Sequence, residues 1–213
     1  MAQSYVKTAE VRSLGRCRAI AISGTPGVGK TTTAKILADM LGAKTIDLSQ
    51  LVIGEGLYIE YDHERKSYII DEDRVRRRVK ELLSHCSEEK EEGYIIIEGH
   101  YAEIVDNQDL EILIVLRRDP RDLLKRLCSR GWGKEKSIEN SEAEYLGICL
   151  ANALNEHPPE KICELDVTEK EPSLVAREIL KILEGSIKCK HGIDWTTSID
   201  PEELYKIANI YCS

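Results

Sequence analysis

The sequence predicts an α/β domain in which helices cover both faces of a parallel sheet. Two observations support this prediction. Short apolar runs, typical of buried parallel strands, alternate with segments of helical period along most of the chain. A glycine-rich turn also joins the first of these apolar runs to the first helical segment. This alternation indicates βαβ units, whose strands become parallel neighbours in one sheet.

The first elements follow a polar segment, residues 1–16, that has no period and is expected to be a flexible arm. The apolar run Arg18–Ser23 precedes the glycine-rich turn and predicts a buried strand. Apolar residues recur at helical spacing through Thr31–Leu41, and Gly42 is expected to end that helix. Ala43–Ile46 is a short candidate for the second strand.

The alternation continues through the rest of the chain. Asp71–His85 is the clearest amphipathic helix, because its apolar residues share one face and the other face is charged. Asp119 and Pro120 supply a helix N-cap and a first-turn proline. The remaining candidates are strands at Gly93–Glu98, Leu110–Leu116 and Ile162–Val167, and helices near Ser141–Asn155 and at Pro172–Glu184.

Two segments depart from this pattern. A polar stretch that contains glycine, residues 130–140, interrupts the helices, and the tail of residues 185–213 resembles an appendage. Asp200-Pro-Glu-Glu-Leu would start a short helix that either packs back on the core or presents a surface to a partner. We therefore expect a single domain over residues 1–184 and assign no role to the tail.

Composition and charge narrow the class of protein. The chain has 213 residues, of which 42% are hydrophobic and 32% charged, as in a soluble globular domain. It has no run near the roughly 18 apolar residues of a membrane helix, and no secretory signal pattern at its start. We expect a cytoplasmic protein, or a nuclear one if the source is eukaryotic. The net charge of −8 argues against sequence-independent nucleic-acid binding.

The seven cysteines include no C-x-x-C pair, and most lie in apolar stretches. The favoured interpretation is core packing in a reducing compartment. Disulfides in a heat-adapted intracellular protein remain an alternative. Cys189 and His191 lie close together in the tail, but two ligands do not make a metal site.

The segment Gly24–Thr31 matches the phosphate-loop pattern G-x-x-x-x-G-K-[ST] between a strand and a helix. Its glycines allow successive backbone N–H groups and the helix N-terminus to face an anion. Lys30 is expected to reach the β- and γ-phosphates of ATP, and the Thr31 hydroxyl to ligate Mg²⁺. We assign ATP binding to Gly27, Gly29, Lys30, Thr31 and Thr32.

A second motif, Glu98-Gly-His100, follows the apolar run that begins at Tyr94. An acidic residue at the end of a buried strand matches the position that orients Mg²⁺ in phosphate-loop enzymes. His100 could position an attacking water or contact the γ-phosphate. The alternatives are that Glu98 caps a helix or pairs with a base, and that His100 is an ordinary loop residue.

A third motif is the basic stretch Arg130-Gly-Trp-Gly-Lys134, which suits a mobile lid. Arg130 would stabilise the charge that phosphoryl transfer spreads over the phosphate oxygens. Trp132 would either cover the nucleotide or anchor the lid in the core, and anchoring is the favoured interpretation. Arg117 and Arg118 end a strand, so one of the two is expected to point into the ligand cleft; Arg117 is our candidate.

A basic run lies on the polar face of the Asp71–His85 helix. A solvated face balanced by neighbouring acids is the favoured interpretation, and an RNA contact is the alternative. The run consists of Arg74, Arg76, Arg77, Arg78 and Lys80.

Five motifs occur in one order and spacing: Gly24-Thr-Pro-Gly-Val-Gly-Lys-Thr-Thr32, Tyr61-Asp62 leading to Asp71-Glu-Asp-Arg-Val75, Glu98-Gly-His100, Val115-Leu-Arg117, and Arg130-Gly-Trp-x-x-x-Lys136-x-x-Glu-Asn140. Together they resemble the small adenylate kinases of archaea and eukaryotic nuclei that also act as ribosome-assembly ATPases (adenylate kinase isoenzyme six, also called Fap). The resemblance covers about residues 18–184.

The resemblance implies a P-loop NTPase fold with a five-stranded parallel sheet, a nucleoside-monophosphate (NMP) region at about residues 47–70 and a short lid at about 130–140. It implies the Mg²⁺-dependent reaction ATP + AMP ⇌ 2 ADP and a weaker ATPase. Arg130 would be the lid arginine, and His100 would match the histidine that follows the metal-binding acid. The implied partner is a ribosomal protein of the small-subunit platform, with a role late in rRNA maturation and a contact with pre-rRNA.

The sequence departs from the family in three places. Glu98 stands where the family usually has Asp, and the tail after Gly185 is longer than expected. The family often has an arginine near Ile53, where this chain has no basic residue. The AMP phosphate would then depend on Arg117 or another group. This departure leaves two alternatives open: an ATP-driven assembly switch with little AMP kinase activity, or another small-molecule kinase.

Overall fold

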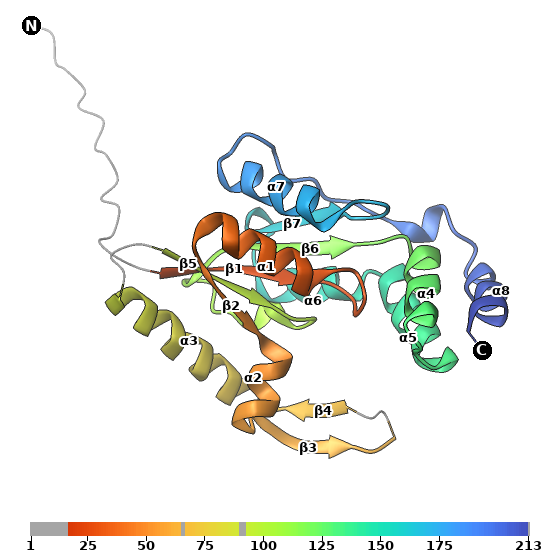
Figure 1. Ribbon diagram of the computed structural model, residues 1–213, viewed down its shortest axis with the longest axis horizontal. Helices are drawn as coiled ribbons and strands as arrows, with labels where there is room; N and C mark the ends of the chain where they lie inside the picture. Colours follow the sequence, from red (N-terminus) through yellow and green to blue (C-terminus); the bar gives the residue numbers. More distant parts are fainter. Residues whose placement is uncertain (1–16, 65–66, 90–92, 213) are drawn as a thin grey trace, which may run out of the picture.

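The computed structural model describes residues 17–64, 67–89 and 93–212, and its centre is a five-stranded parallel sheet in the order β2-β5-β1-β6-β7 (Figure 1). Every neighbouring pair of these strands is parallel, as the alternation in the sequence predicts. The strands are β1 (Cys17–Ser23), β2 (Lys44–Asp47), β5 (Gly93–Glu98), β6 (Leu110–Arg117) and β7 (Ile162–Asp166).

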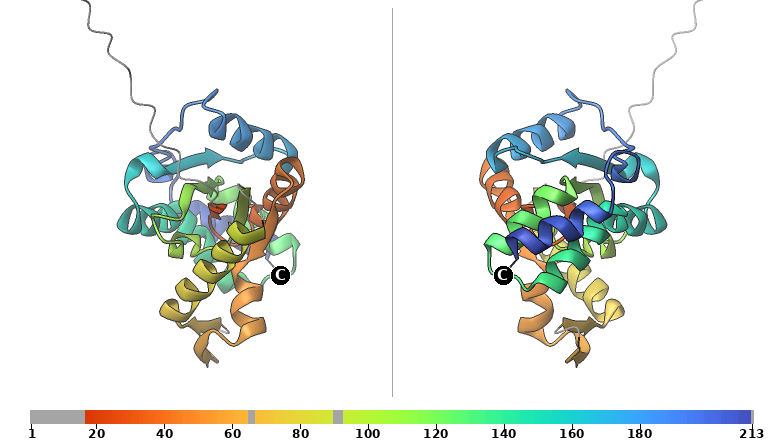
Figure 2. Two further views of the ribbon diagram at one scale, coloured as in Figure 1. Left: turned by 90° about the vertical axis from the view of Figure 1, so that its left-hand side faces the viewer. Right: turned by 90° about the vertical axis from the view of Figure 1, so that its right-hand side faces the viewer.

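Helices cover both faces of the sheet (Figure 2). Alternate residues of β1 show why its sequence is continuously apolar: Ala19 and Ala21 pack on one side, and Ile20 and Ile22 on the other. The alanine face packs against α3 (Glu72–Glu89) and α6 (Ile148–Glu156), and the isoleucine face against α1 (Lys30–Leu41), α4 (Pro120–Ser129) and α7 (Pro172–Leu183).

The NMP region folds as a short helix and a hairpin beside the sheet (Figure 1). Asp47, at the end of β2, accepts hydrogen bonds from the backbone N–H groups of Ser49 and Gln50 and thereby caps the helix that follows. The region comprises α2 (Leu48–Glu55) and the antiparallel pair β3 (Tyr58–Asp62) and β4 (Ser67–Ile70), a hairpin that the sequence analysis did not predict.

The lid segment is more helical than expected. Asp119 caps α4 as predicted, and the chain turns through Arg130–Gly133 before α5 (Lys134–Tyr145) begins. The helix predicted near Ser141–Asn155 is wrong in its extent: α5 and α6 are separate helices. The break falls at Gly147, whose φ of 68° is a left-handed conformation that glycine adopts readily.

The tail packs back on the core, which resolves the choice that the sequence left open. After η2 (Pro159–Lys161), β7 and α7, the chain continues past Gly185 through η3 (Trp195–Thr197) into α8 (Glu202–Tyr211). Leu204 and Ala208 of α8 share a buried cluster with Leu124 of α4, and α8 lies beside α4 and α5 (Figure 2).

Four cysteines form two disulfides, Cys17–Cys86 and Cys128–Cys212. The favoured prediction of reduced core cysteines is therefore wrong for these four. The reason is that the partners lie 69 and 84 residues apart, so their spacing carries no local signal. Cys149, Cys163 and Cys189 are free.

Two further expectations concern membranes and metals. Among the described residues, no helix is both long and apolar enough to cross a membrane. The same part of the chain contains no cluster of three or more histidine, cysteine, aspartate or glutamate side chains suited to a metal ion. The flexible arm expected for residues 1–16 lies outside the described residues.

Candidate active site

The phosphate loop connects β1 to α1 and depends on glycine at particular positions. Gly24, Gly27 and Gly29 have φ values of 142°, 95° and 117°. A Cβ on Gly24 would lie 2.6 Å from the carbonyl oxygen of Leu116, and one on Gly27 would lie 2.8 Å from the Leu127 side chain. The loop can therefore wrap closely at the N-terminus of α1, where free N–H groups and the helix dipole favour an anion.

Lys30, the first residue of α1, folds back over this loop. Its Nζ donates hydrogen bonds to the carbonyl oxygens of Gly24 (2.7 Å) and Thr25 (3.2 Å). Burial lowers the pKa of Lys30, and the nearby carboxylates of Glu98 and Asp47 oppose that shift. The ammonium group is thus held directly against the backbone that would surround a phosphate.

Thr31 and Glu98 meet at the carboxyl end of the sheet. The Thr31 hydroxyl donates to Glu98 Oε1 at 2.7 Å, and Asp47 pairs in register with Glu98 on the adjacent strand. Burial, and secondarily the charge of Asp47, raise the pKa of Glu98. A hydroxyl and two carboxylates are the hard oxygen donors that Mg²⁺ takes together with phosphate oxygens and water. These residues therefore fit a nucleotide-bound Mg²⁺.

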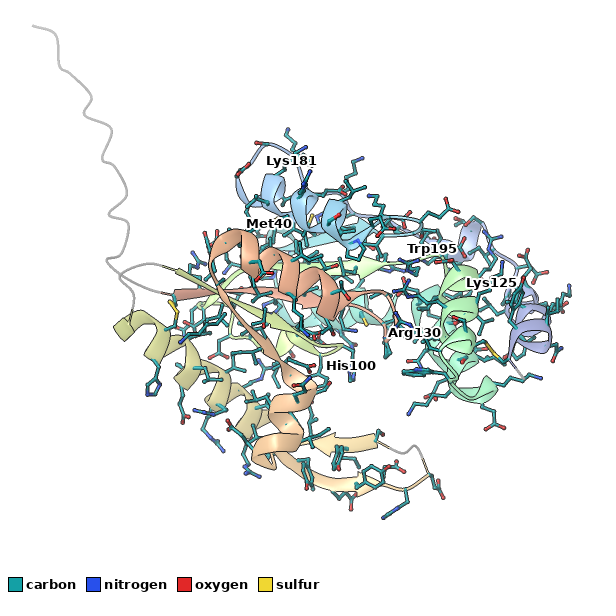
Figure 3. The ribbon with its side chains drawn as sticks, in the orientation of Figure 1. Met40, His100, Lys125, Arg130, Lys181 and Trp195 are labelled. Atoms are coloured by element: carbon teal, nitrogen blue, oxygen red, sulfur yellow. A yellow bond between two sulfur atoms is a disulfide. The ribbon has the colours of Figure 1, made fainter. Side chains whose placement is uncertain are left out.

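His100 follows β5 on the side of the sheet toward which the parallel strands point (Figure 3). The Ser23 hydroxyl donates to the His100 carbonyl oxygen at 3.3 Å, which ties this loop to the end of β1. Desolvation, and secondarily the charge of Lys30, lower the pKa of His100 to about 4, although part of the residue is exposed. The imidazole is therefore neutral at pH 7 and can accept a proton or a hydrogen bond.

A pocket of about 290 Å³ lies beside the phosphate loop, and arginines line it together with Gly29 and Thr32. Arg118 and Arg126 line this pocket, and the Nε of each is buried without a hydrogen-bond partner among the described residues. Burial lowers the pKa of Arg126, and the nearby charge of Arg130 adds to the effect. The Arg118 guanidinium pairs with Asp122 and donates to the Val167 carbonyl oxygen at 2.9 Å, so Arg126 is the better candidate for holding an anionic ligand beside the phosphate loop.

Arg130 is exposed at the end of α4, and Figure 3 shows it on the same side of the sheet as His100. Arg126 was missed in the sequence analysis. The available signal was its spacing, because residues four apart lie on one face of a helix and Arg126 precedes Arg130 by four. Trp132 packs against the core, as an anchoring residue should.

Arg117 lies elsewhere than expected. Its side chain is fully buried, with Nε 2.7 Å from Glu144 and Nη1 2.6 Å from Glu164. Glu144 also accepts from the Thr25 hydroxyl of the phosphate loop at 2.6 Å. The structure thus corrects the expectation that Arg117 points into the cleft: its guanidinium is occupied by two carboxylates. Arg118 is the member of the pair that lines the pocket beside the phosphate loop.

A second and larger pocket, of about 490 Å³, opens between the NMP region and the core, and we call it the acceptor pocket. Its volume lies within the usual range for small-molecule sites. None of its described lining residues is Arg or Lys, so the lack of a basic residue near Ile53 is not made up by another cation in the lining. The lining residues are Ser49, Val52, Ile53, Ser67, Tyr68, Ile70, Glu72, His100, Tyr101, Glu103 and Asn152.

Comparisons with known proteins agree with this arrangement. The sequence family described as "AAA domain" matches residues 20–147. A protein of Saccharolobus islandicus strain Y.G.57.14, named "Putative adenylate kinase", is 37% identical over 196 residues, 90% of this chain and 97% of that protein. A protein of the same name from Methanocaldococcus jannaschii is 37% identical over 177 residues, 83% of this chain and 92% of that protein.

Solved structures show the same fold at low identity. Thymidylate kinase from Candida albicans matches with a TM-score of 0.52 and 18% identity, over 81% of this chain and 93% of that one. An uncharacterised protein from Eubacterium ventriosum matches with a TM-score of 0.53 and 15% identity, over 79% of this chain and 98% of that one. A phosphate loop follows the central strand of the parallel sheet, and the archaeal relatives are 37% identical over nearly their full length. The chain therefore belongs to the family of these archaeal adenylate-kinase-like P-loop proteins.

Proposed function

We propose that the protein transfers the γ-phosphoryl group of Mg²⁺·ATP to AMP, giving two ADP, and hydrolyses ATP more slowly. One observation carries this proposal: two separate pockets lie next to the site formed by Lys30, Thr31 and Glu98. The pocket lined by Gly29 and Arg126 suits the donor nucleotide, and the acceptor pocket suits the monophosphate. The names of the archaeal relatives support the same reaction.

Each residue then has a separate task. Lys30 and the loop N–H groups hold the donor phosphates, while Thr31 and Glu98 hold Mg²⁺, which neutralises phosphate charge when it is bound. Arg126 and Arg130 stabilise charge on the transferring group. Closure of the Arg130–Gly133 turn over the nucleotide would exclude water and favour transfer over hydrolysis.

A second candidate is an ATP-driven assembly switch whose ATPase cycle controls its grip on a small-subunit platform ribosomal protein and pre-rRNA. The lack of a cation in the described lining of the acceptor pocket favours it, because no Arg or Lys there meets a monophosphate and Arg117 is engaged elsewhere. The basic run of α3 gives little support to an RNA contact. Arg76 pairs with Glu156 at 2.6 Å, and Arg78 with Glu55 at 2.7 Å.

The test is ADP production from Mg²⁺·ATP with and without AMP, with other nucleoside monophosphates and small metabolites in parallel. Strong AMP-specific stimulation is expected. Slow hydrolysis that ignores AMP would favour the switch, which predicts ATP-dependent release of a bound ribosomal protein. A non-nucleotide acceptor that outcompetes AMP would identify a small-metabolite kinase instead.

The matched variants are Lys30→Ala and Lys181→Ala. Lys181 is an exposed lysine of α7, far from the phosphate loop in Figure 3. Lys30→Ala should abolish both hydrolysis and AMP phosphorylation, because both need the phosphate clamp, and Lys181→Ala should change neither. A fully active Lys30→Ala variant would contradict the site assignment.

A further inference from the structure

The acceptor pocket contains one buried acid that the proposed mechanism does not use. Glu103 lies on η1 (Ala102–Ile104), is 8% exposed and lines both the acceptor pocket and an adjoining pocket of about 250 Å³. Its Oε2 is buried and has no hydrogen-bond partner among the described residues. A buried polar atom without a partner destabilises the fold, so a ligand that satisfies this oxygen gains in affinity.

No cation among the described residues pairs with the carboxyl group of Glu103. Arg76 of α3 lines the adjoining pocket, but its guanidinium is taken by Glu156 at 2.6 Å and by the Ile104 carbonyl oxygen at 3.0 Å. Glu72 of α3 and Glu156 of α6 add negative charge, and Asn152 of α6 offers a hydrogen bond.

The imidazole of His157 lies close by but does not contact the carboxyl group of Glu103. His157 instead contacts the backbone carbonyl oxygen of Glu103 through Nε2 at 2.9 Å. Burial first, and then the charges of Glu156 and Glu72, raise the pKa of Glu103 to about 7. The carboxyl group is therefore about half protonated near neutral pH.

The other walls of the pocket suit a purine. Tyr68 and Tyr101 supply aromatic surface, and Val52, Ile53 and Ile70 supply aliphatic surface. His100 lines the same pocket, and the charge of Lys30 acts on it. If the acceptor phosphate points toward His100 and the phosphate loop, the base is directed toward η1.

We propose that Glu103 recognises the base of the acceptor nucleotide and that its carboxyl group selects adenine over guanine when it carries a proton. This inference rests on the proposed function, because it concerns the acceptor of that same reaction. It adds a specificity-determining residue that the phosphate-loop motifs do not contain.

The chemistry follows from donors and acceptors. A protonated carboxyl group presents an O–H donor beside a carbonyl acceptor. The Watson–Crick edge of adenine presents an acceptor, N1, beside a donor, the 6-amino group, so the two edges match. A carboxylate only accepts, which suits the N1–H and 2-amino donors of guanine and leaves adenine N1 facing a negative charge. Loss of the proton should therefore reverse the preference.

The experiment measures kcat/KM for AMP and for GMP between pH 5.5 and 8.5, with saturating Mg²⁺·ATP and the full chain. The ratio of the two cancels the titration of the nucleotide phosphates, which occurs near a pKa of about 6. In the unaltered protein the AMP/GMP ratio should fall at least tenfold between pH 6 and 8, because the protonated fraction falls from about nine-tenths to about one-tenth across a pKa of about 7.

Three variants make the test specific. Glu103→Gln keeps a donor and an acceptor at every pH, so the ratio should stay high and become independent of pH. Glu103→Met has a similar size and no polar atom, so the ratio should approach one. Glu72→Gln removes a neighbouring carboxylate of the same pocket and should keep the pH dependence, with its midpoint moved to lower pH because the charge of Glu72 raises the pKa of Glu103. Thermal unfolding of each variant checks that it is folded.

A ratio in the unaltered protein that does not change with pH, or a Glu103→Gln variant that follows the same pH curve as the unaltered protein, would overturn the inference. Calorimetric titration of AMP and GMP at pH 6 and 8, without ATP, separates this failure from failure of the proposed function. Binding selectivity that changes with pH, without phosphoryl transfer, supports Glu103 and refutes the kinase. Transfer to AMP with an unchanged ratio supports the kinase and refutes Glu103.

Discussion

Replacing Arg117 with methionine tests whether this arginine serves the fold or the acceptor phosphate. The guanidinium sits between Glu144 and Glu164, and all three residues are 1% exposed. Arg117→Met keeps much of the side-chain volume but leaves two carboxylates buried together without a cation. Breaking a buried ion pair from one side typically costs about 3–5 kcal/mol, because an uncompensated charge remains.

This cost converts to a large shift in thermal unfolding. For a chain of 150–250 residues, 1 kcal/mol corresponds to about 2–4 °C in Tm, so Arg117→Met should lower Tm by about 6–20 °C. The matched control is Arg121→Met. Arg121 pairs with Asp119 and Glu203 at the surface, where an ion pair contributes about 0–1 kcal/mol. Circular dichroism melts and urea titrations of both variants give the comparison.

The loss should also depend on pH in a defined direction. Burial raises the pKa of Glu144, and Arg117 is the main group that opposes this effect. Without the guanidinium, the folded state binds a proton more readily than the unfolded chain, whose carboxyls titrate near about 4.3. Stability of the variant therefore rises as pH falls. The deficit relative to the unaltered protein should be widest near pH 8 and narrow toward pH 5.

Enzyme kinetics distinguish the two roles of Arg117. At a temperature well below the Tm of the variant, KM for AMP should stay within about threefold of the original value, since the guanidinium does not reach the acceptor pocket. A variant with unchanged stability and a much larger KM for AMP would refute this reasoning and return Arg117 to the cleft.

Three further predictions concern the metal, the histidine and a disulfide. Glu98→Gln should raise the Mg²⁺ concentration needed for half-maximal activity by at least about tenfold, measured by Mg²⁺ titration of ADP formation, because it removes a charged oxygen donor. His100→Ala should lower ATP hydrolysis about 100-fold and AMP phosphorylation much less, since only hydrolysis needs an oriented water; equal losses would contradict this. Hydrolysis should also be flat from pH 6 to 8 and fall as pH approaches the His100 pKa of about 4, where the neutral ring is lost. Cys212→Ser opens the 84-residue link to Cys128 and should cost about 2–4 kcal/mol in urea unfolding, whereas Cys189→Ser, at a free cysteine, should cost much less.

The parts of the fold that the sequence predicts are those that local chemistry decides. A strand buried on both faces must be apolar along its whole length, so β1, β5 and β6 are visible as continuous runs. The phosphate loop is visible for the same reason, because only glycine fits at Gly24 and Gly27. Thr31 and Glu98 then meet, since both lie at the carboxyl end of parallel neighbours.

The features that the sequence analysis missed depend on partners far away in the chain. A strand-end arginine can face the ligand cleft, but Arg117 meets Glu144 and Glu164, which lie 27 and 47 residues further on. In the sequence, Glu103 resembles a surface acid in an irregular loop, and the packing of α3 and α6 beside it is not visible there. The disulfides likewise join residues whose proximity arises only from tertiary packing.

The hydrogen-bond network around Arg117 connects the tail, residues 185–213, to the phosphate loop. The Thr25 hydroxyl of the phosphate loop donates to Glu144, which binds Arg117, and Arg117 binds Glu164. Glu164 in turn accepts from the backbone N–H of Gly192 at 2.7 Å, and the Trp195 indole reaches Glu144 at 3.4 Å. Because a buried carboxylate needs each of its donors, removing the tail would loosen the groups that hold the phosphate loop. We therefore expect removal of residues 186–213 to weaken ATP binding, although Gly192 and Trp195 do not line the pocket beside the phosphate loop.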